Sequence, residues 1–171
     1  KQLKEKINKL IKNKIISNNS RIIFIDDGSK DKTWNKIEDL NLKDSLFGGV
    51  KLSKNNGHQN ALLAGLISSK DKADIVISMD ADLQDDINAI DRMLEEYNKG
   101  SEIVYGVRKE RSTDTFFKRN TALIFYKVMS RLGVDSVYNH ADYRLMSSRA
   151  ISELANFREV NLFLRGIVPL L

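Results

Sequence analysis

The chain of 171 residues contains no cysteine, a single proline and no apolar run of about 18 residues. Without cysteine it forms neither disulfide bonds nor thiolate metal sites, which fits a reducing compartment. Without a long apolar run, no segment reads as a helix that spans a bilayer. Because Pro169 is the only proline, the turns depend on Gly, Asn and Asp.

Several motifs of common active sites are also missing. The sequence has neither Gly-x-Gly-x-x-Gly nor a Walker A motif, so dinucleotide-binding folds with that fingerprint and P-loop nucleotidases lose support. His58 and His140 are too few for a zinc site, and such histidines are more often structural. Ser29 has no evident base partner, which argues against a serine nucleophile.

The composition is that of an ordinary globular protein. Hydrophobic residues make up 42% and charged residues 30% of the chain. A chain of this length buries roughly 70% of its unfolded surface, so we expect residues 1–171 to form a single domain.

The net charge of +5 comes largely from two basic clusters, which could attract nucleic acid, anionic lipid or phosphorylated ligands. The first lies in the opening helical pattern, where a solvated helix face explains it best. The second overlaps an aromatic helical pattern at 115–132, which fits either a membrane surface or an ordinary amphipathic helix. The clusters consist of Lys1, Lys4, Lys6, Lys9, Lys12 and Lys14, and of Arg108, Lys109, Arg111, Lys118, Arg119, Lys127 and Arg131.

Strand-like and helix-like patterns alternate along the first two thirds of the chain. This alternation predicts an α/β fold with a mostly parallel sheet and helices on both faces. After the helical pattern at 115–132, the remaining residues show no clear period. The predicted strands are 21–26, 47–52, 74–79 and 102–107, and the helix after the third of them is 87–98.

Two aspartates follow the most apolar of these strands. Asp80 and Asp82 stand one residue apart, directly after Ile75-Val-Ile-Ser-Met. Carboxylate oxygens suit a hard cation such as Mg²⁺ or Mn²⁺, which keeps waters and bridges to substrate phosphates. The pattern therefore predicts a metal site for a phosphorylated substrate, with turn formation or helix capping as the alternative.

A second acidic strand end lies upstream, at Asp26 and Asp27. Because the carboxyl ends of parallel strands share one edge, we expect Asp26, Asp27, Asp80, Asp82 and Arg108 to converge there. Clustered carboxylates are costly unless a cation or polar ligand compensates them. Chance placement at the mouths of loops is the alternative.

The ordered motifs resemble those of family-2 glycosyltransferases with the GT-A fold, a Rossmann-like fold of nucleotide-diphospho-sugar transferases. Within that family they are most similar to the polyprenyl-phosphate and dolichyl-phosphate sugar transferases. The resemblance covers about residues 20–171. It rests on Ile25-Asp-Asp-Gly-Ser29-x-Asp31-x-Thr33, Asn55-x-Gly57-x-x-x-Ala61-Leu62-x-x-Gly65, Met79-Asp-Ala-Asp-Leu-Gln-Asp85, Tyr105-Gly-Val-Arg108, Asp142-Tyr-Arg-Leu145 and Phe163-x-Arg165-Gly166.

The resemblance implies an inverting, metal-dependent hexosyltransferase whose donor is a UDP- or GDP-sugar. It places Asp26 and Asp27 at the base and ribose, Asp80 near the ribose, and Asp82 on a divalent metal that bridges the diphosphate. Gln84 is then close to the donor, and Ser29 and Asn55 belong to the substrate-binding set.

For the acceptor, the resemblance implies a polyprenyl phosphate at the cytoplasmic side of the cell membrane. A phosphate oxygen is already ionised near neutral pH, so no strong base is required. Arg108, Arg119 and Arg144 are the residues expected to hold this phosphate, because guanidinium binds phosphate in bidentate geometry. Asp142 is either the base or organiser of this site, or a simple ion-pair partner of Arg144.

The chain also departs from the family pattern. The first strand and a Pro-x-Tyr-Asn-Glu-like loop are not found before Lys1, and the membrane helices that often follow the catalytic domain are absent. We therefore expect a fragment of a catalytic domain. No nucleic-acid partner is expected, the membrane surface is, and homo-oligomerisation stays open.

Three alternatives compete with this interpretation. In a two-component receiver domain, Asp26 and Asp27 would hold Mg²⁺, Asp80 would accept phosphate and Lys109 would be the edge lysine; Asp82 would then be unexplained. A transferase with a glycan or protein acceptor is the second alternative. The third is a sugar-binding domain without catalysis.

Overall fold

The protein is described by a computed structural model that covers residues 1–82, 84–107, 140–157 and 164–171. The chain divides into two compact units, Lys1–Val76 and Ile77–Leu171. Among the described residues, one sheet has two strands and the other has three. That residues 1–171 form one catalytic domain stays a prediction.

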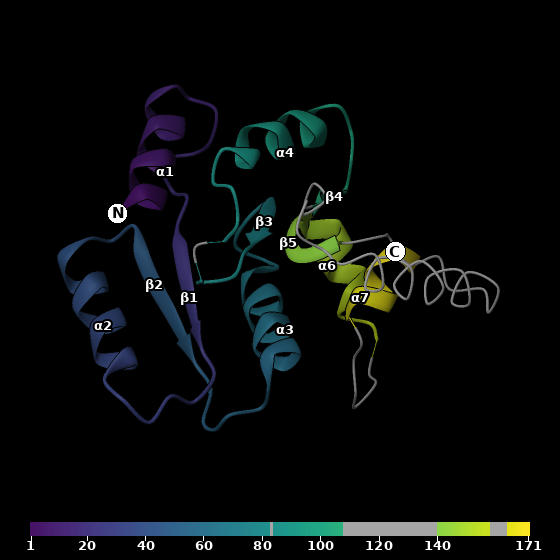
Figure 1. The fold of residues 1–171 in the computed structure, drawn as a ribbon. Coiled ribbons are helices and arrows are strands. Elements are labelled where there is room, and N and C mark those ends of the chain that lie inside the picture. Colours follow the sequence, from purple (N-terminus) through teal and green to yellow (C-terminus); the bar gives the residue numbers. More distant parts are fainter. Residues whose placement is uncertain (83, 108–139, 158–163) are drawn as a thin grey trace, which may run out of the picture. The chain divides into compact units, whose positions relative to one another are not determined.

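Helices and strands alternate as far as residue 107, as the sequence predicts. Figure 1 shows their course along the chain. In chain order they are α1 (Gln2–Lys12), β1 (Ile22–Asp26), α2 (Thr33–Lys43), β2 (Phe47–Lys51), α3 (His58–Ser69), β3 (Ile75–Ser78), α4 (Ala89–Asn98), β4 (Ile103–Val107), β5 (His140–Ser147), α6 (Ser148–Leu154), α7 (Leu164–Ile167) and the 3₁₀ turn η1 (Val168–Leu170).

The first unit is built on the parallel pair β1 and β2. Their register runs from Ile22 opposite Phe47 to Asp26 opposite Lys51. The β-branched and aromatic residues of β1 favour a strand, and the Phe24 and Phe47 rings stack with centroids 6.0 Å apart. Because the strands are parallel, the loops that follow them leave from the same edge of this sheet.

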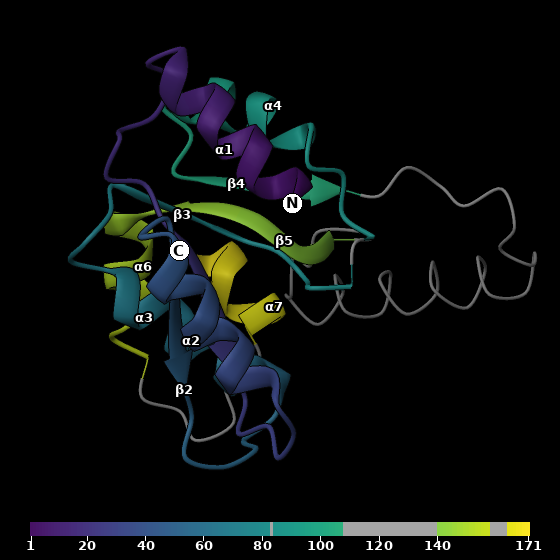
Figure 2. The ribbon, with the colours of Figure 1, turned by 90° about the vertical axis from the view of Figure 1, so that its left-hand side faces the viewer.

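Helices α2 and α3 cover opposite faces of this pair. A Cβ on Gly49 of β2 would lie 2.6 Å from Ile37 of α2, and a Cβ on Gly65 of α3 would lie 2.8 Å from Ile25 of β1. Gly49 is opposite Phe24, and successive side chains alternate between faces, so Ile25 points to the other side. Figure 2 shows α2 lying along β2. The prediction of helices on both faces is therefore confirmed for this sheet.

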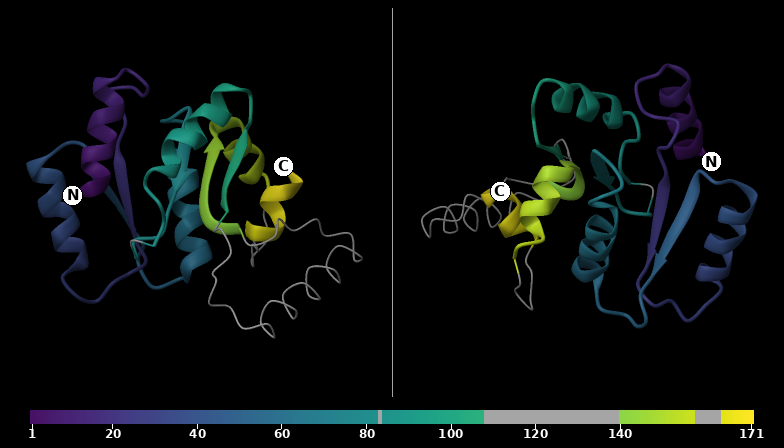
Figure 3. Two further views of the ribbon diagram at one scale, coloured as in Figure 1. Left: turned by 45° about the horizontal axis from the view of Figure 1, so that its top comes forward. Right: turned by 180° about the vertical axis from the view of Figure 1, so that it is seen from behind.

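The prediction of a mostly parallel sheet is wrong for the second unit. Here the strand order is β3-β5-β4, and β5 runs antiparallel to β4 with Ile103 opposite Met146. The register shifts between Tyr105 and Val107. Figure 3 shows the long β5 beside β4 in its left panel. The described sheets are thus small and only partly parallel, because a strand from late in the chain lies between β3 and β4.

Strand β5 lies at the centre of the core of this unit. Residues 142–147 are all buried, and the neighbouring Leu145 and Met146 are both completely inaccessible, so both faces of the strand are covered. Helices α4 and α6 pack against β5, and the Ser147 hydroxyl caps α6 by accepting the Ala150 N–H at 3.0 Å. In the described part of the chain, no helix has the length and apolar character needed to cross a membrane.

Candidate functional site

Asp26 ends β1 with a carboxylate that is almost completely buried. Only 3% of the residue is exposed, and its Oδ1 accepts the Ser29 N–H at 3.1 Å. The backbone continues the ladder, since the Leu52 N–H donates to the Asp26 carbonyl at 2.9 Å. Its Oδ2 is buried and has no hydrogen-bond partner in the structure. A buried acceptor without a donor is unfavourable, so this oxygen is a candidate for contact with a ligand N–H or O–H.

The neighbouring Asp27 bonds to a loop far away in the sequence. Its Oδ1 accepts the Asn56 N–H at 2.7 Å, and its Oδ2 accepts the Gly57 N–H at 2.9 Å. The two aspartates are adjacent in sequence, yet their carboxylates have different partners. Predicted contacts of Asp27, and of the exposed Ser29 and Asn55, with a substrate stay predictions.

Gln59, in the first turn of α3, is a residue that sequence reasoning missed. Its Oε1 is buried and has no hydrogen-bond partner in the structure. Helix α3 begins directly after Gly57, which Asp27 holds. The first unit thus carries two buried acceptor oxygens that have no hydrogen-bond donor, Asp26 Oδ2 and Gln59 Oε1. The position of Gln59 beside the Asn55-x-Gly57 motif was the available signal.

The second acidic pair follows β3 in a tight loop. The Asp80 N–H donates to Asp85 Oδ2 at 3.1 Å, and Asp82 Oδ1 accepts the Gln84 N–H at 3.0 Å. Asp80 is half-buried, whereas Asp82 and Gln84 are exposed. The hydrogen bond from the Gln84 N–H to Asp82 is a turn-forming bond, and turn formation was the alternative to metal binding in the sequence analysis. This bond uses only one of the two Asp82 oxygens.

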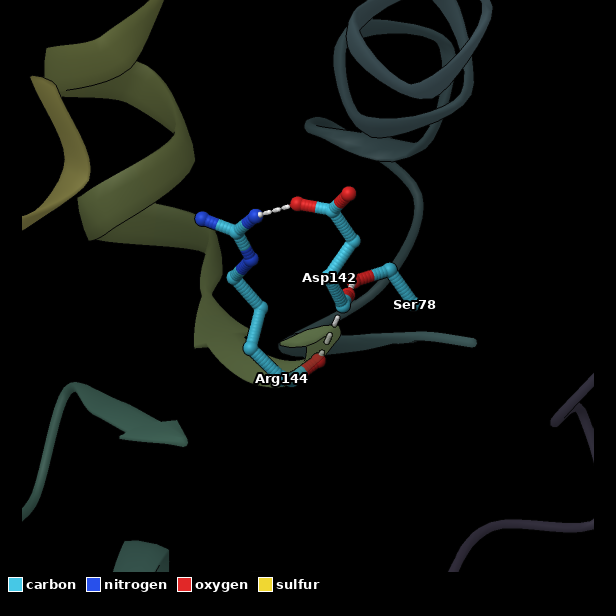
Figure 4. Close-up of polar contacts among 3 residues, drawn as sticks. All are labelled: Ser78, Asp142 and Arg144. Carbon is cyan, nitrogen blue, oxygen red and sulfur yellow. Dashed lines mark hydrogen bonds and ion pairs between the residues drawn. The ribbon is translucent and has the colours of Figure 1, made fainter. Parts of the chain in front are cut away.

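The second unit also contains a buried ion pair. Arg144 Nη2 lies 2.5 Å from Asp142 Oδ1, with side-chain exposures of 0% and 3%. Figure 4 shows this pair together with Ser78 of β3, whose hydroxyl donates to the Asp142 carbonyl at 2.6 Å. The two residues are therefore ion-pair partners, which was one of the two predicted roles of Asp142. Whether either also contacts an acceptor phosphate stays a prediction.

Two tyrosines near this pair have raised pKa values. Burial, followed by the charges of Asp85 and Asp86, raises the pKa of Tyr143 to about 12. Burial also raises the pKa of Tyr105, against the opposing charge of Arg144. The Tyr143 hydroxyl donates to the Asp86 carbonyl at 3.0 Å, which joins the loop after β3 to β5. Both phenols are therefore neutral at physiological pH.

The sequence predicts that Asp80 and Asp82 bind a divalent metal. Among the described residues, no group of three or more His, Cys, Asp or Glu side chains could hold a metal ion. The described residues therefore provide no all-protein cage for a metal. A Mg²⁺ or Mn²⁺ site can take one or two carboxylates and complete its shell with waters and substrate phosphates, so a metal at Asp80 and Asp82 stays a prediction. The exposed Asp82 has the chemistry for that role.

Some predicted residues lie outside the described ones. These are Arg108 and Arg119, together with the basic aromatic segment 115–132. The convergence of the Asp26/Asp27 pair with the Asp80/Asp82 pair stays a prediction, because the two pairs belong to different units.

A hollow of about 590 Å³ lies in the second unit, away from the predicted residues. Its charged lining comes from Glu102, Arg149 and Glu153. Glu102 and Arg149 form an ion pair at 3.1 Å, and Glu102 also accepts a hydrogen bond from the Ser147 hydroxyl. The Ser147 bond, and then Arg149, lower the pKa of Glu102. Neighbouring side chains thus account for the charges of Glu102 and Arg149.

Comparisons with known proteins agree with the sequence motifs. The family described as Glycosyl transferase family 2 matches residues 1–155, which include both acidic loops. The chain is 54% identical over 170 residues to the uncharacterized glycosyltransferase YkoT of Bacillus subtilis (strain 168), covering 99% of this chain and 50% of that protein. It is 39% identical over 148 residues to the bactoprenol glucosyl transferase of Shigella phage SfX, covering 86% of this chain and 48% of that protein.

A third relative is the prophage bactoprenol glucosyl transferase homolog of Escherichia coli (strain K12), which is 38% identical over 148 residues, 86% of this chain and 48% of that protein. The chain spans about half the length of the curated relatives it matches. The comparisons give the receiver-domain alternative no support. The extent of the family match and the identity to these relatives establish that the chain belongs to glycosyl transferase family 2.

Proposed function

We propose that the whole protein is an inverting glucosyltransferase of the GT-A fold that moves glucose from UDP-glucose or GDP-glucose to a polyprenyl phosphate. One observation carries this proposal. Proteins named bactoprenol glucosyl transferase match 148 residues of the chain at 38–39% identity, and the family match includes both acidic loops. We place the reaction at the cytoplasmic side of the cell membrane, with the membrane surface as a partner.

The first unit supplies acceptors for the donor's nucleoside. The buried Asp26 Oδ2 and Gln59 Oε1 have no donor in the structure. A nucleobase imide and the ribose hydroxyls are N–H and O–H donors that would satisfy such oxygens. Burial strengthens these bonds and makes a ligand without the donors bind poorly, because the oxygens then stay unpaired.

The second unit supplies the carboxylate for a divalent cation. We assign this role to Asp82, with Asp80 beside it in the same loop. A bound Mg²⁺ or Mn²⁺ would offset the negative charge that develops on the departing nucleoside diphosphate. Gln84 donates its backbone N–H to Asp82 and so restrains that side chain in the loop.

The acceptor phosphate needs cations more than it needs a base. Its oxygen is ionised near neutral pH and attacks the anomeric carbon as the bond to the nucleoside diphosphate breaks, which inverts the configuration. We assign the phosphate to Arg108 and Arg119. The 2.5 Å bond between Asp142 and the buried Arg144 favours Asp142 as an organiser of β5 over Asp142 as a base.

Nucleotide binding tests the donor half of the proposal. Thermal denaturation of the whole protein is measured with UDP, GDP or ADP, with Mn²⁺ or with EDTA. A ligand at about 100 times its Kd stabilises the native state by about 2.7 kcal/mol, so UDP or GDP should raise Tm by several degrees when Mn²⁺ is present. ADP is the matched control. Equal shifts with all three nucleotides, or no shift with any, would contradict the proposal.

A further inference from the structure

The loop between β3 and α4 carries Asp82, to which we assign the divalent cation. Its described residues are 79–82 and 84–88. Two of its backbone N–H groups are bonded by its own aspartates: Asp85 Oδ2 accepts the Asp80 N–H at 3.1 Å, and Asp82 Oδ1 accepts the Gln84 N–H at 3.0 Å. These bonds join loop residues to one another. A contact that fixes the loop relative to the sheet has to come from a residue outside it.

Tyr143 of β5 makes such a contact. Its hydroxyl donates to the Asp86 carbonyl at 3.0 Å, between residues that are 57 positions apart in the sequence. The same carbonyl accepts the N–H of Ala89, the first residue of α4, at 2.9 Å, and the Asp86 carboxylate accepts the Asn88 N–H at 2.9 Å. The Tyr143 hydroxyl therefore holds the loop at the point where it passes into α4. Burial raises the pKa of Tyr143 to about 12, so the hydroxyl keeps its proton at physiological pH.

Close packing holds the ring of this tyrosine in place. Tyr143 is 4% exposed, and Met93 of α4 is 3% exposed. A Cβ on Gly106 of β4 would lie 2.6 Å from Tyr143 Cδ1 and 3.1 Å from Met93 Cε. The ring thus lies in the space that a side chain at Gly106 would fill, beside β4 and α4. Because protein interiors are close-packed, a ring in this position has little freedom and its hydroxyl has a fixed place.

Tyr143 can be tested separately from the buried ion pair. Successive side chains of a strand point to opposite faces, so Tyr143 lies on one face of β5 and its neighbours Asp142 and Arg144 lie on the other. The Tyr143 hydroxyl bonds to the loop, whereas the ion pair joins two residues of β5 to each other. Removal of this hydroxyl therefore leaves the ion pair in place.

We propose that Tyr143 is a positioning residue for the divalent cation: through its bond to the Asp86 carbonyl, it holds the β3–α4 loop in the conformation in which Asp82 binds the metal. Its action passes through the loop backbone. Mg²⁺ demands near-ideal geometry, and residues that orient the ligands of a metal affect its affinity strongly. This inference rests on the proposed function, because that function assigns the cation to Asp82.

Tyr143→Phe removes the hydroxyl and keeps the ring that packs beside Gly106. We expect the ligand-free variant to fold, with Tm lowered by about 2–4 °C for the lost hydrogen bond. The amides of Asp80 and Gln84 should exchange faster with solvent, because the loop that orders them is no longer held by β5. Amide hydrogen exchange of the whole protein without metal or nucleotide measures this effect independently of activity.

Tyr97→Phe is the matched control. It removes a phenolic hydroxyl from the last turn of α4, about 12 Å along the helix from Ala89, where the helix begins. The control should match the wild type in exchange at Asp80 and Gln84 and in every measurement with metal.

The metal itself is tested by two measurements on the whole protein. One is the Mn²⁺ dependence of the rise in Tm caused by UDP or GDP, whichever stabilises the wild type. The other is steady-state kinetics with the corresponding nucleotide-glucose and polyprenyl phosphate. For Tyr143→Phe, the half-saturating Mn²⁺ concentration should rise about tenfold in both, with kcat at saturating Mn²⁺ and the acceptor KM within about twofold of wild type. With EDTA, the variant and the wild type should respond alike to the nucleotide.

Three results would overturn the inference. The first is Tyr143→Phe with wild-type Mn²⁺ dependence, whatever its Tm, because the hydroxyl would then only stabilise the fold. The second is a raised Mn²⁺ requirement with unchanged exchange at Asp80 and Gln84, because the hydroxyl would then not act through the loop. The third is an equal rise for Tyr97→Phe. Failure of the proposed function would look different: the wild-type protein would show no Mn²⁺-dependent response to either nucleotide, and the inference would fail with it.

Discussion

The buried pair of Asp142 and Arg144 allows a prediction whose size follows from the geometry. At 2.5 Å and an effective dielectric of about 20, two unit charges attract by roughly 7 kcal/mol. Asp142→Asn removes the negative charge and leaves the guanidinium completely buried. Part of the attraction is offset by the desolvation of the carboxylate, so breaking such a pair costs about 3–5 kcal/mol. For a chain of this length, the corresponding fall in Tm is about 6–20 °C.

Thermal denaturation followed by far-UV circular dichroism measures this fall. The matched control is Glu96→Gln, which breaks a pair of similar length, 2.8 Å, between side chains that are 66% and 48% exposed. The control should melt with the wild type, because solvent screens such pairs. If Asp142→Asn also melts within about 1 °C of the wild type, the pair does not stabilise β5 and the reasoning is refuted. Loss of transfer activity with unchanged Tm would then favour Asp142 as a base.

Three further predictions concern other contacts of the described residues. Gly28→Ala should lower Tm by more than Gly57→Ala, because both have positive φ but only Gly28 lies against the backbone of Lys54; equal effects would contradict the close contact. The folded pKa of Tyr143 of about 12 exceeds the unfolded value of about 10, so its contribution to stability is complete below pH 10 and lost as pH rises through 12. Tyr143→Phe should abolish that part of alkaline unfolding, and an unchanged pH profile would count against it. Ser78→Ala removes a 2.6 Å bond to the β5 backbone and should cost about 1 kcal/mol in urea unfolding, whereas no change would mean that the hydroxyl is equally well hydrated in the unfolded chain.

Local sequence patterns were sufficient for the first four strands. The apolar run before Asp26 and the one before Asp80 predicted β1 and β3, and both acidic pairs lie in loops that follow these strands. The predicted helix at 87–98 is α4, Ala89–Asn98. These elements were predictable because their periodicity and their turn residues are local properties of the chain.

Strand β5 was not predictable in this way. Its sequence, His140-Ala-Asp-Tyr-Arg-Leu-Met-Ser147, places ionisable groups inside a strand that is buried on both faces. Such a strand is tolerated because Asp142 and Arg144, two residues apart on one face, neutralise each other. The covering of both faces of the strand by other elements is a tertiary property, and it leaves no period in the sequence. The antiparallel pairing with β4, and with it the partly parallel sheet, was missed for the same reason.

The different hydrogen-bond partners of Asp26 and Asp27 also required coordinates. The motif Asp-Asp-Gly-Ser marks both residues alike, and the partners of Asp27 are 29 and 30 residues further along the chain. For Gln59 the only signal in the sequence was its place beside the Asn55-x-Gly57 motif, since a glutamine near the start of a helix is ordinary. The hydrogen-bond partners distinguish these residues. Both carboxylate oxygens of Asp27 accept a backbone N–H, whereas one oxygen of Asp26 and one of Gln59 have no donor.

The most direct test of the proposed function is the transfer of radiolabelled glucose by the whole protein from UDP-glucose or GDP-glucose to added polyprenyl phosphate. We predict that label enters the lipid extract, that EDTA prevents this, and that Asp82→Asn abolishes it without lowering Tm. Label that enters only protein or glycan, or an Asp82→Asn variant with wild-type turnover, would contradict the account.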